Sequence, residues 1–316
     1  ESDLASYKVY GGTSSSPTTL LSTISAGTET YTNSSLTNGT LYYYRISAVD
    51  NAGNESSKTS DVSSLPHATD GDYSLSFDGS NDYVSIADAD ELDGMSQLTI
   101  QFYLKWDSYP YPTHGKGVQI IEKWQTASAN AVGAYSFYTH YDADMFTYMV
   151  GEQPNNQLGV NIGLSSNMSL NTWYLISGVY DGQYSSLYID GELKGQVAMT
   201  GTVASTDYPL ELANQNNSNT TYFDGNIDEV AIWNDALTAA EITALYNSGV
   251  PLPASTNSGN YISSANLKGY WRFGENTGTI LYDLSGNGNN GTISGATYSG
   301  QGANGVLPTI SSVSLA

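Results

Sequence analysis

The sequence predicts an all-β protein: an antiparallel jelly-roll β-sandwich preceded by part of a second, smaller β-sandwich. Three observations predict this class. Short stretches of alternating apolar and polar residues recur along the chain and are separated by turn residues. Tyrosine, which suits half-buried strands, occurs 26 times against 6 phenylalanines. Hydrophobic residues make up 39% of the chain and charged residues 13%, which favours a packed core over disorder.

The first part of the chain contains short strands joined by polar turns. Residues 5–10 and 41–49 alternate in polarity, and the glycine pair at 11–12 and the segment 51–54 are turn signals. Residues 7–10 (YKVY), 36–42 (LTNGTLY) and 44–50 (YRISAVD) resemble the second half of a fibronectin type III domain. In that family a tyrosine corner matches the spacing of Leu36 and Tyr42.

This resemblance implies that residues 1–66 are part of a fibronectin type III domain, whose first two strands would precede Tyr7. Residues 67–71 form a linker in this interpretation, and residues 72–300 form one continuous β-rich domain. Residues 301–316 are expected to be a linker and the first strand of a following immunoglobulin-like domain. We therefore expect the chain to be one section of a modular protein.

The region 72–300 contains many short candidate strands and one helix. Its candidate strands are residues 73–77, 83–86, 98–106, 119–123, 173–180, 185–189, 210–213, 225–233 and 269–273. The helix is predicted over residues 238–246, because Thr238 and Glu241 form a capping box and Gly249 follows as a stop signal. Asp-Gly pairs at 181–182 and 190–191 predict hairpin turns.

Five blocks of this region resemble a laminin G-like, concanavalin A-like jelly roll of the bacterial extracellular type. They are residues 75–86 (LSFDGSNDYVSI), 98–105 (LTIQFYLK), 171–192 with NTWYLISGVYDG and LYIDGE, 223–237 (FDGNIDEVAIWNDAL), and the final pair 270–273 (YWRF) and 283–292 (DLSGNGNNGT). The resemblance implies a β-sandwich in residues 72–300 and an extracellular or cell-surface protein.

Charge excludes several partners. The 31 acidic and 9 basic residues give a formal net charge of −22, so nucleic acids and anionic membranes would be repelled. Cysteine is absent, which excludes disulfides and zinc-thiolate sites. No segment of the sequence predicts membrane insertion.

Acidic and amide residues in tight turns predict a structural calcium ion, which the resemblance also implies. Calcium takes six to eight oxygen ligands and often mixes carboxylates with carbonyls. The candidate ligands are Asp78, Asp228, Asp283, Asn287 and Asn289. The alternative is that these side chains make Asx-turns with their own backbone.

The segment 106–148 departs most from the family and is rich in aromatic residues beside proline and glycine. We expect the aromatic residues beside Pro110, Pro112 and Gly115 to lie in loops, where their rings could stack on a sugar. The candidate glycan-binding residues are Trp106, Tyr109, Tyr111, Trp124, Tyr138 and Tyr141. The alternative is that the rings cover loop cores.

No catalytic pattern is present. Glycosidases of this fold carry paired carboxylates on one strand in a Glu-x-Asp-x-x-Glu arrangement, which the sequence lacks. Asp228 and Glu229 are adjacent, so regular alternation would point them to opposite faces. The sequence therefore predicts a non-catalytic binding or adhesion module, stabilised by calcium, with a glycan or cell-surface ligand. The alternative is a structural spacer or filament subunit that assembles head to tail through unpaired strands.

Overall fold

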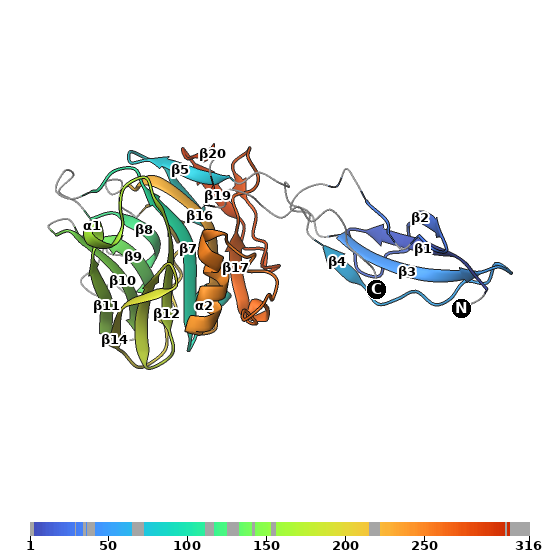
Figure 1. Ribbon diagram of the computed structural model, residues 1–316, viewed down its shortest axis with the longest axis horizontal. Helices are drawn as coiled ribbons and strands as arrows, with labels where there is room; N and C mark the ends of the chain where they lie inside the picture. Colours follow the sequence, from blue (N-terminus) through green and yellow to red (C-terminus); the bar gives the residue numbers. More distant parts are fainter. Residues whose placement is uncertain are drawn as a thin grey trace. The chain divides into compact units, whose positions relative to one another are not determined.

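The computed structural model describes residues 3–28, 30–33, 36, 42–64, 73–110, 117–124, 133–140, 143–152, 156–214, 222–300 and 302–303. Its contacts divide the chain into two compact units, one within residues 1–70 and one within residues 71–307 (Figure 1). The predicted linker 67–71 and the strand expected near 310–315 lie outside the described residues. Among the residues described, no helix is long and apolar enough to cross a membrane.

The N-terminal unit is a four-stranded antiparallel sheet in the order β2-β1-β3-β4. Its strands are β1 (Leu4–Gly12), β2 (Leu20–Ser25), β3 (Tyr42–Asp50) and β4 (Val62–Ser64). Val9 on β1 pairs with Ile46 on β3 and is buried, as the alternating pattern predicts. The assignment of this unit to the fibronectin type III family stays a prediction.

The second unit is a sandwich of two antiparallel sheets, which confirms the predicted all-β class (Figure 1). We call the first the β8 sheet, in the order β11-β10-β9-β8-β15-β6-β19-β18. Its strands are β6 (Tyr83–Ile86), β8 (Gln119–Trp124), β9 (Gly133–Thr139), β10 (Met145–Glu152), β11 (Asn156–Gly163), β15 (Leu210–Leu212), β18 (Ile280–Leu281) and β19 (Gly291–Ser294).

We call the second the β7 sheet, in the order β14-β13-β12-β7-β16-β5-β20, with β17 paired to β16. Its strands are β5 (Ser74–Asp78), β7 (Leu98–Trp106), β12 (Trp173–Tyr180), β13 (Tyr184–Ile189), β14 (Glu192–Ala198), β16 (Asp224–Trp233), β17 (Leu267–Trp271) and β20 (Thr297–Ser299). Short helical segments are η1 (Asp90–Leu92), α1 (Leu164–Asn167), η2 (Asn247–Gly249) and η3 (Ser264–Asn266).

The main core lies between the two sheets. Alternate residues of β7, including Phe102 and Leu104, point inward and are fully buried. The Phe102 ring meets the Phe137 ring of the β8 sheet edge to face, with centroids 4.9 Å apart. Side chains from both sheets therefore interdigitate, as in other β-sandwiches.

A second core covers the outer face of the β7 sheet. Helix α2 (Ala239–Tyr246) packs there together with Trp233 and Tyr261 (Figure 1). The predicted capping box is confirmed, since Thr238 accepts a bond from the Glu241 backbone and the Glu241 side chain bonds back to Thr238. Because this second core covers the outer face of the sheet, strands β7 and β16 are buried on both faces.

The hairpin turn predicted at residues 190–191 is also confirmed. It joins β13 to β14, and both Asp190 and Gly191 have positive φ, as a two-residue type I′ turn requires.

The loop expected around Pro110 is confirmed for the described residues 107–110, which lie outside any strand, but other aromatic residues of the segment 106–148 lie in strands. Trp106, Trp124 and Tyr138 lie in strands β7, β8 and β9. The reason is visible in β9, whose inward residues Tyr135 and Phe137 alternate with outward ones and build the core.

Candidate functional site

A row of polar side chains crosses the outer face of the β8 sheet. Strand register places Thr292 opposite Ser85, Ser85 opposite Glu211, Glu211 opposite Glu122, and Glu122 opposite Ser136. Directly opposed residues in a sheet share one face. Their strand neighbours face the core, so this row faces away from it. We call these five residues the polar row.

The centre of the polar row is a facing pair of carboxylates. Glu122 is 1% exposed and Glu211 is 8% exposed, although both lie on the outer face. Burial raises the pKa of Glu211, and the hydrogen bond from Asn214 opposes that rise. The amide Nδ2 of Asn214 donates to Glu211 Oε2 over 3.0 Å. Two carboxyl groups thus occupy directly opposed positions in a poorly hydrated place.

A strained residue positions Asn214. Ala213 follows β15, is fully buried and has a φ of 65°, a conformation that costs energy for a residue with a Cβ. Its backbone N–H bonds to Ile120 O on the neighbouring strand, over 2.8 Å. The chain therefore turns sharply at the end of β15 and sets the Asn214 amide against Glu211.

Several oxygen atoms around the polar row have unused hydrogen-bonding capacity. Within the described part of the chain, Ser136 Oγ, Asn214 Oδ1 and Gln119 Oε1 are buried without a hydrogen-bond partner. Buried polar atoms are nearly always paired in folded proteins, so such a group calls for a reason. Because the two amide oxygens accept hydrogen bonds and the Ser136 hydroxyl can accept or donate one, they match a ligand that presents hydroxyl groups.

Two of the predicted glycan-binding rings lie on the same sheet as the polar row. Tyr138 is opposite Gln119 and half-buried. Trp124 is 4% exposed, and its ring covers Gly133 and Gly151, where any larger side chain would collide with it. Tyr138 thus keeps part of its surface for a ligand, whereas Trp124 packs against the sheet.

The other predicted glycan-binding residues are not gathered there. Trp106 is fully buried and meets Phe223 edge to face in the core, so it offers no ring face to a sugar. The Tyr109 hydroxyl donates to the Met168 carbonyl. Tyr111 and Tyr141 lie outside the described residues. The structure therefore brings Trp124 and Tyr138 to the β8 sheet and leaves Trp106 on the other.

The predicted calcium ligands fall into three separate places. Asp78 ends β5 and is exposed, and its Oδ1 accepts from the Ser80 backbone. Asp228 is buried in β16 and accepts from the backbones of Glu229 and Ala303. Among the residues that the structure describes, no three His, Cys, Asp or Glu side chains are grouped as metal ligands.

The remaining three candidates form one loop after β18. Asp283 accepts four bonds, from the backbones of Tyr270, Ser285 and Asn289 and from the Ser285 hydroxyl. A carboxylate has about four acceptor positions, so these bonds leave Asp283 none for a cation. Asn289 Nδ2 donates to the Lys268 carbonyl and Asn287 Nδ2 does the same. The five predicted ligands therefore do not fit one calcium ion, and the loop matches the Asx-turn alternative.

Thermal melting of the purified chain, with and without added calcium, tests whether the predicted site binds the ion. A bound ion at a hundredfold excess over its Kd would stabilise the protein by about 2.7 kcal/mol. Because the Asp283 carboxylate is filled by internal bonds, we expect wild type and Asp283→Asn to respond identically to added calcium. A calcium-dependent rise in melting temperature that is present in wild type and absent in Asp283→Asn would restore the predicted site.

The carboxylates of β16 do not alternate as expected. A bulge lies between Asp228 and Ala231, and Glu229 within it has a φ of 51°. Glu229 is turned toward Tyr270 and Arg272, and it bonds both. The expectation that Asp228 and Glu229 point to opposite faces by regular alternation was therefore wrong, because the bulge interrupts the strand.

Sequence reasoning missed the four residues that make the centre of the site: Glu122, Ser136, Glu211 and Asn214. One signal was present. A charged Glu-Lys pair follows two isoleucines in strand β8, and charged residues are seldom buried without a reason. The sequence contains no comparable signal that β8 pairs with β15, because this pairing depends on the order of the strands in the sheet.

The fold is a two-sheet β-sandwich, and sequence comparison identifies its superfamily. A family model described as the concanavalin A-like lectin/glucanases superfamily, of laminin G type, matches residues 78–243, more than half of the chain. The chain belongs to this superfamily. No curated protein matches it.

Similar folds are found among solved structures. A "putative carbohydrate binding protein" from Bacteroides ovatus is 15% identical, with a TM-score of 0.53 over 88% of this chain and 72% of that one. A heptameric SAP-like pentraxin from Limulus polyphemus is 14% identical, with a TM-score of 0.44 over 71% of this chain and 94% of that one. The botulinum neurotoxin serotype D binding domain is 16% identical, with a TM-score of 0.43 over 54% and 41%. At these identities the likeness concerns the fold alone.

Proposed function

We propose that this chain is a non-catalytic saccharide-binding module of an extracellular protein, and that its ligand lies on the outer face of the β8 sheet along the polar row. The observation that carries the proposal is the group of buried oxygen acceptors around Glu211, namely Ser136 Oγ, Asn214 Oδ1 and Gln119 Oε1. A few convergent polar groups that fix orientation are typical of small-molecule sites. The Bacteroides ovatus protein, provisionally described as carbohydrate-binding, has a similar fold.

The polar row has a direction that suits an extended ligand. Thr292 at one end is exposed, Ser85 is half-buried, and Glu211 is 8% exposed. A saccharide laid along β19 and β6 would present hydroxyl donors to Glu211 at the inner end. Carboxylates accept such bonds strongly, and each bond to a charged group contributes about 1.5–3 kcal/mol.

The charge of the chain narrows the ligand class. A net charge of −22 and two carboxylates in the site disfavour sialylated, sulfated or phosphorylated glycans. Neutral saccharides with neighbouring hydroxyl groups are the favoured class.

The same geometry argues against hydrolysis. Retaining glycosidases place two carboxyl groups about 5–5.5 Å apart on either side of the scissile bond. Glu122 and Glu211 face each other, but Glu122 is 1% exposed and Glu211 is tied to Asn214. At 1% exposure Glu122 cannot serve as the second carboxylate beside Glu211 at a glycosidic bond, so we propose binding without cleavage.

An array of neutral β-glucans, mannans and galactans tests the function, followed by calorimetric titration of the best binder. We expect Glu211→Gln to weaken binding about tenfold or more, because a charged acceptor is lost. Glu192→Gln is the matched control, since Glu192 is exposed on β14 of the other sheet and should leave binding unchanged.

Two further readouts complete this experiment. The bound saccharide should show no new reducing ends after long incubation with wild type. An array without any binder, or binding that Glu211→Gln leaves intact, would contradict the proposed site.

A further inference from the structure

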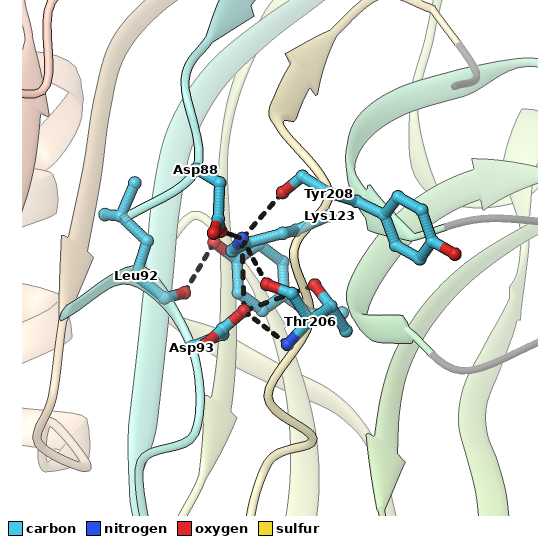
Figure 2. Close-up of polar contacts among 7 residues, drawn as sticks. Asp88, Leu92, Asp93, Lys123, Thr206 and Tyr208 are labelled. Atoms are coloured by element: carbon cyan, nitrogen blue, oxygen red, sulfur yellow. Dashed lines mark hydrogen bonds and ion pairs between the residues drawn. The ribbon is translucent and has the colours of Figure 1, made fainter. Parts of the chain in front are cut away.

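Lys123 lies on strand β8 beside Glu122 but points to the opposite side of the sheet, into the protein. Its side chain is 0% exposed, which is rare for lysine. Four oxygen atoms surround its ammonium group (Figure 2). They are Asp88 Oδ1, Asp93 Oδ2 at 3.1 Å, the Tyr208 carbonyl at 2.7 Å and the Thr206 carbonyl at 3.4 Å. A buried ammonium thus sits between two carboxylates that come from the segment after β6.

The two carboxylates are held differently. Asp93 Oδ2 also accepts from the backbone N–H of Thr206 at 2.9 Å and from its hydroxyl at 3.2 Å, and the Asp93 side chain is 2% exposed. Asp88 contacts Lys123 directly, and its side chain is 33% exposed. Asp93 is therefore held by Thr206 as well as by Lys123, whereas the Asp88 carboxyl group contacts Lys123 and is partly open to water.

The surrounding chain holds the three groups together. Tyr135, opposite Lys123 on β9, donates its hydroxyl hydrogen to the Leu92 carbonyl at 2.9 Å, which ties η1 over the lysine. Groups held in contact by a fold react as if present at very high concentration. A neutral lysine amine held against a carboxyl carbon is a nucleophile.

We propose that Lys123 and Asp88 condense into an intramolecular isopeptide bond, with Asp93 as the proton carrier. This amide would tie β8 covalently to the segment between β6 and β7, in a chain that has no cysteine for disulfides. The inference is independent of saccharide binding, since Lys123 faces away from the polar row.

The step balances in atoms and charge. One proton passes from the ammonium to the Asp88 carboxylate, which leaves a neutral amine and a carboxylic acid. The Nζ lone pair attacks Cγ and forms the N–C bond. Asp93 takes a second proton from Nζ and delivers it to the Asp88 hydroxyl, and the C–O bond breaks with release of one water. The third hydrogen stays on the amide and can be donated to the Tyr208 carbonyl. Asp93 ends as it began.

Intact-mass spectrometry of the folded and then denatured chain tests this bond. We expect wild type to be lighter than its sequence mass by one water. Lys123→Met and Asp88→Ala should both have the full sequence mass, and Asp93→Asn should retain the full mass or lose water slowly. Lys194→Met is the matched control, because Lys194 pairs with Glu192 at the surface and its variant should still lose water.

A digest of wild type keeps the test decisive if a variant fails to fold. Trypsin cleaves after a free lysine, so a modified Lys123 should resist cleavage and appear in a branched peptide joined to the peptide that contains Asp88. A wild-type chain with the full sequence mass and normal cleavage after Lys123 would overturn the proposal and leave a buried ion pair.

Discussion

Replacement of Trp106 by alanine is expected to lower the free energy of unfolding of the sandwich unit by about 3–5 kcal/mol. Trp106 ends β7 and is fully buried, and its ring packs edge to face on Phe223 with centroids 4.9 Å apart. Truncation would leave a large cavity between the sheets, which close-packed neighbours refill only in part. Urea unfolding followed by far-ultraviolet circular dichroism measures the loss.

Trp173→Ala is the matched control. Trp173 lies half-buried on β12, with the Lys105 ammonium 5.6 Å from its ring centroid. Its loss should cost about 1 kcal/mol, the usual size for a partly exposed cation–π contact. A Trp106→Ala protein as stable as wild type that has lost saccharide binding would contradict the core role and restore the ligand role predicted from sequence.

Sequence reasoning was sufficient where the interacting residues lie close together in the chain. Where a few neighbouring residues determine the local structure, the sequence predicted that structure correctly. The Asp190 and Gly191 turn needs two residues that accept positive φ, and the capping box needs Thr238 and Glu241 three residues apart. Both were predicted because the interacting groups are close in sequence.

The candidate site could not be predicted in this way. Glu122 and Glu211 come from strands far apart in the chain, and only the insertion of β15 between β6 and β8 sets them opposite each other. A register shifted by one residue would turn Glu211 to the other face of the sheet. Neither the sequence of β8 nor that of β15 alone predicts which of their residues face each other.

The calcium prediction illustrates the opposite difficulty. The loop of residues 283–290 has the composition of a cation site, but the same oxygen-bearing side chains can bond their own backbone. In the structure the Asp283 carboxylate takes four internal bonds, three of them from backbone N–H groups. Composition cannot distinguish the two outcomes, because both need aspartate, asparagine and glycine in a tight turn.

Arg272 carries the second large expectation, since its replacement by methionine should also cost about 3–5 kcal/mol. Arg272 Nε donates to Glu229 Oε1 over 2.9 Å, and the Tyr270 hydroxyl donates to the other oxygen of the same carboxylate. The charge of Glu229 raises the pKa of Arg272 above its ordinary value. The Glu229 side chain is 8% exposed, so without the arginine a poorly hydrated carboxylate would lose its counterion.

A double replacement separates this desolvation effect from lost packing. Glu229→Gln combined with Arg272→Met removes both charges, so it should recover a large part of the loss seen in Arg272→Met alone. Arg45→Met is the matched control in the other unit, because the Arg45–Asp61 pair is partly exposed and should contribute at most about 1 kcal/mol. If the double variant were as unstable as Arg272→Met, the cost would lie in packing around β17, and the buried charge would not be its cause.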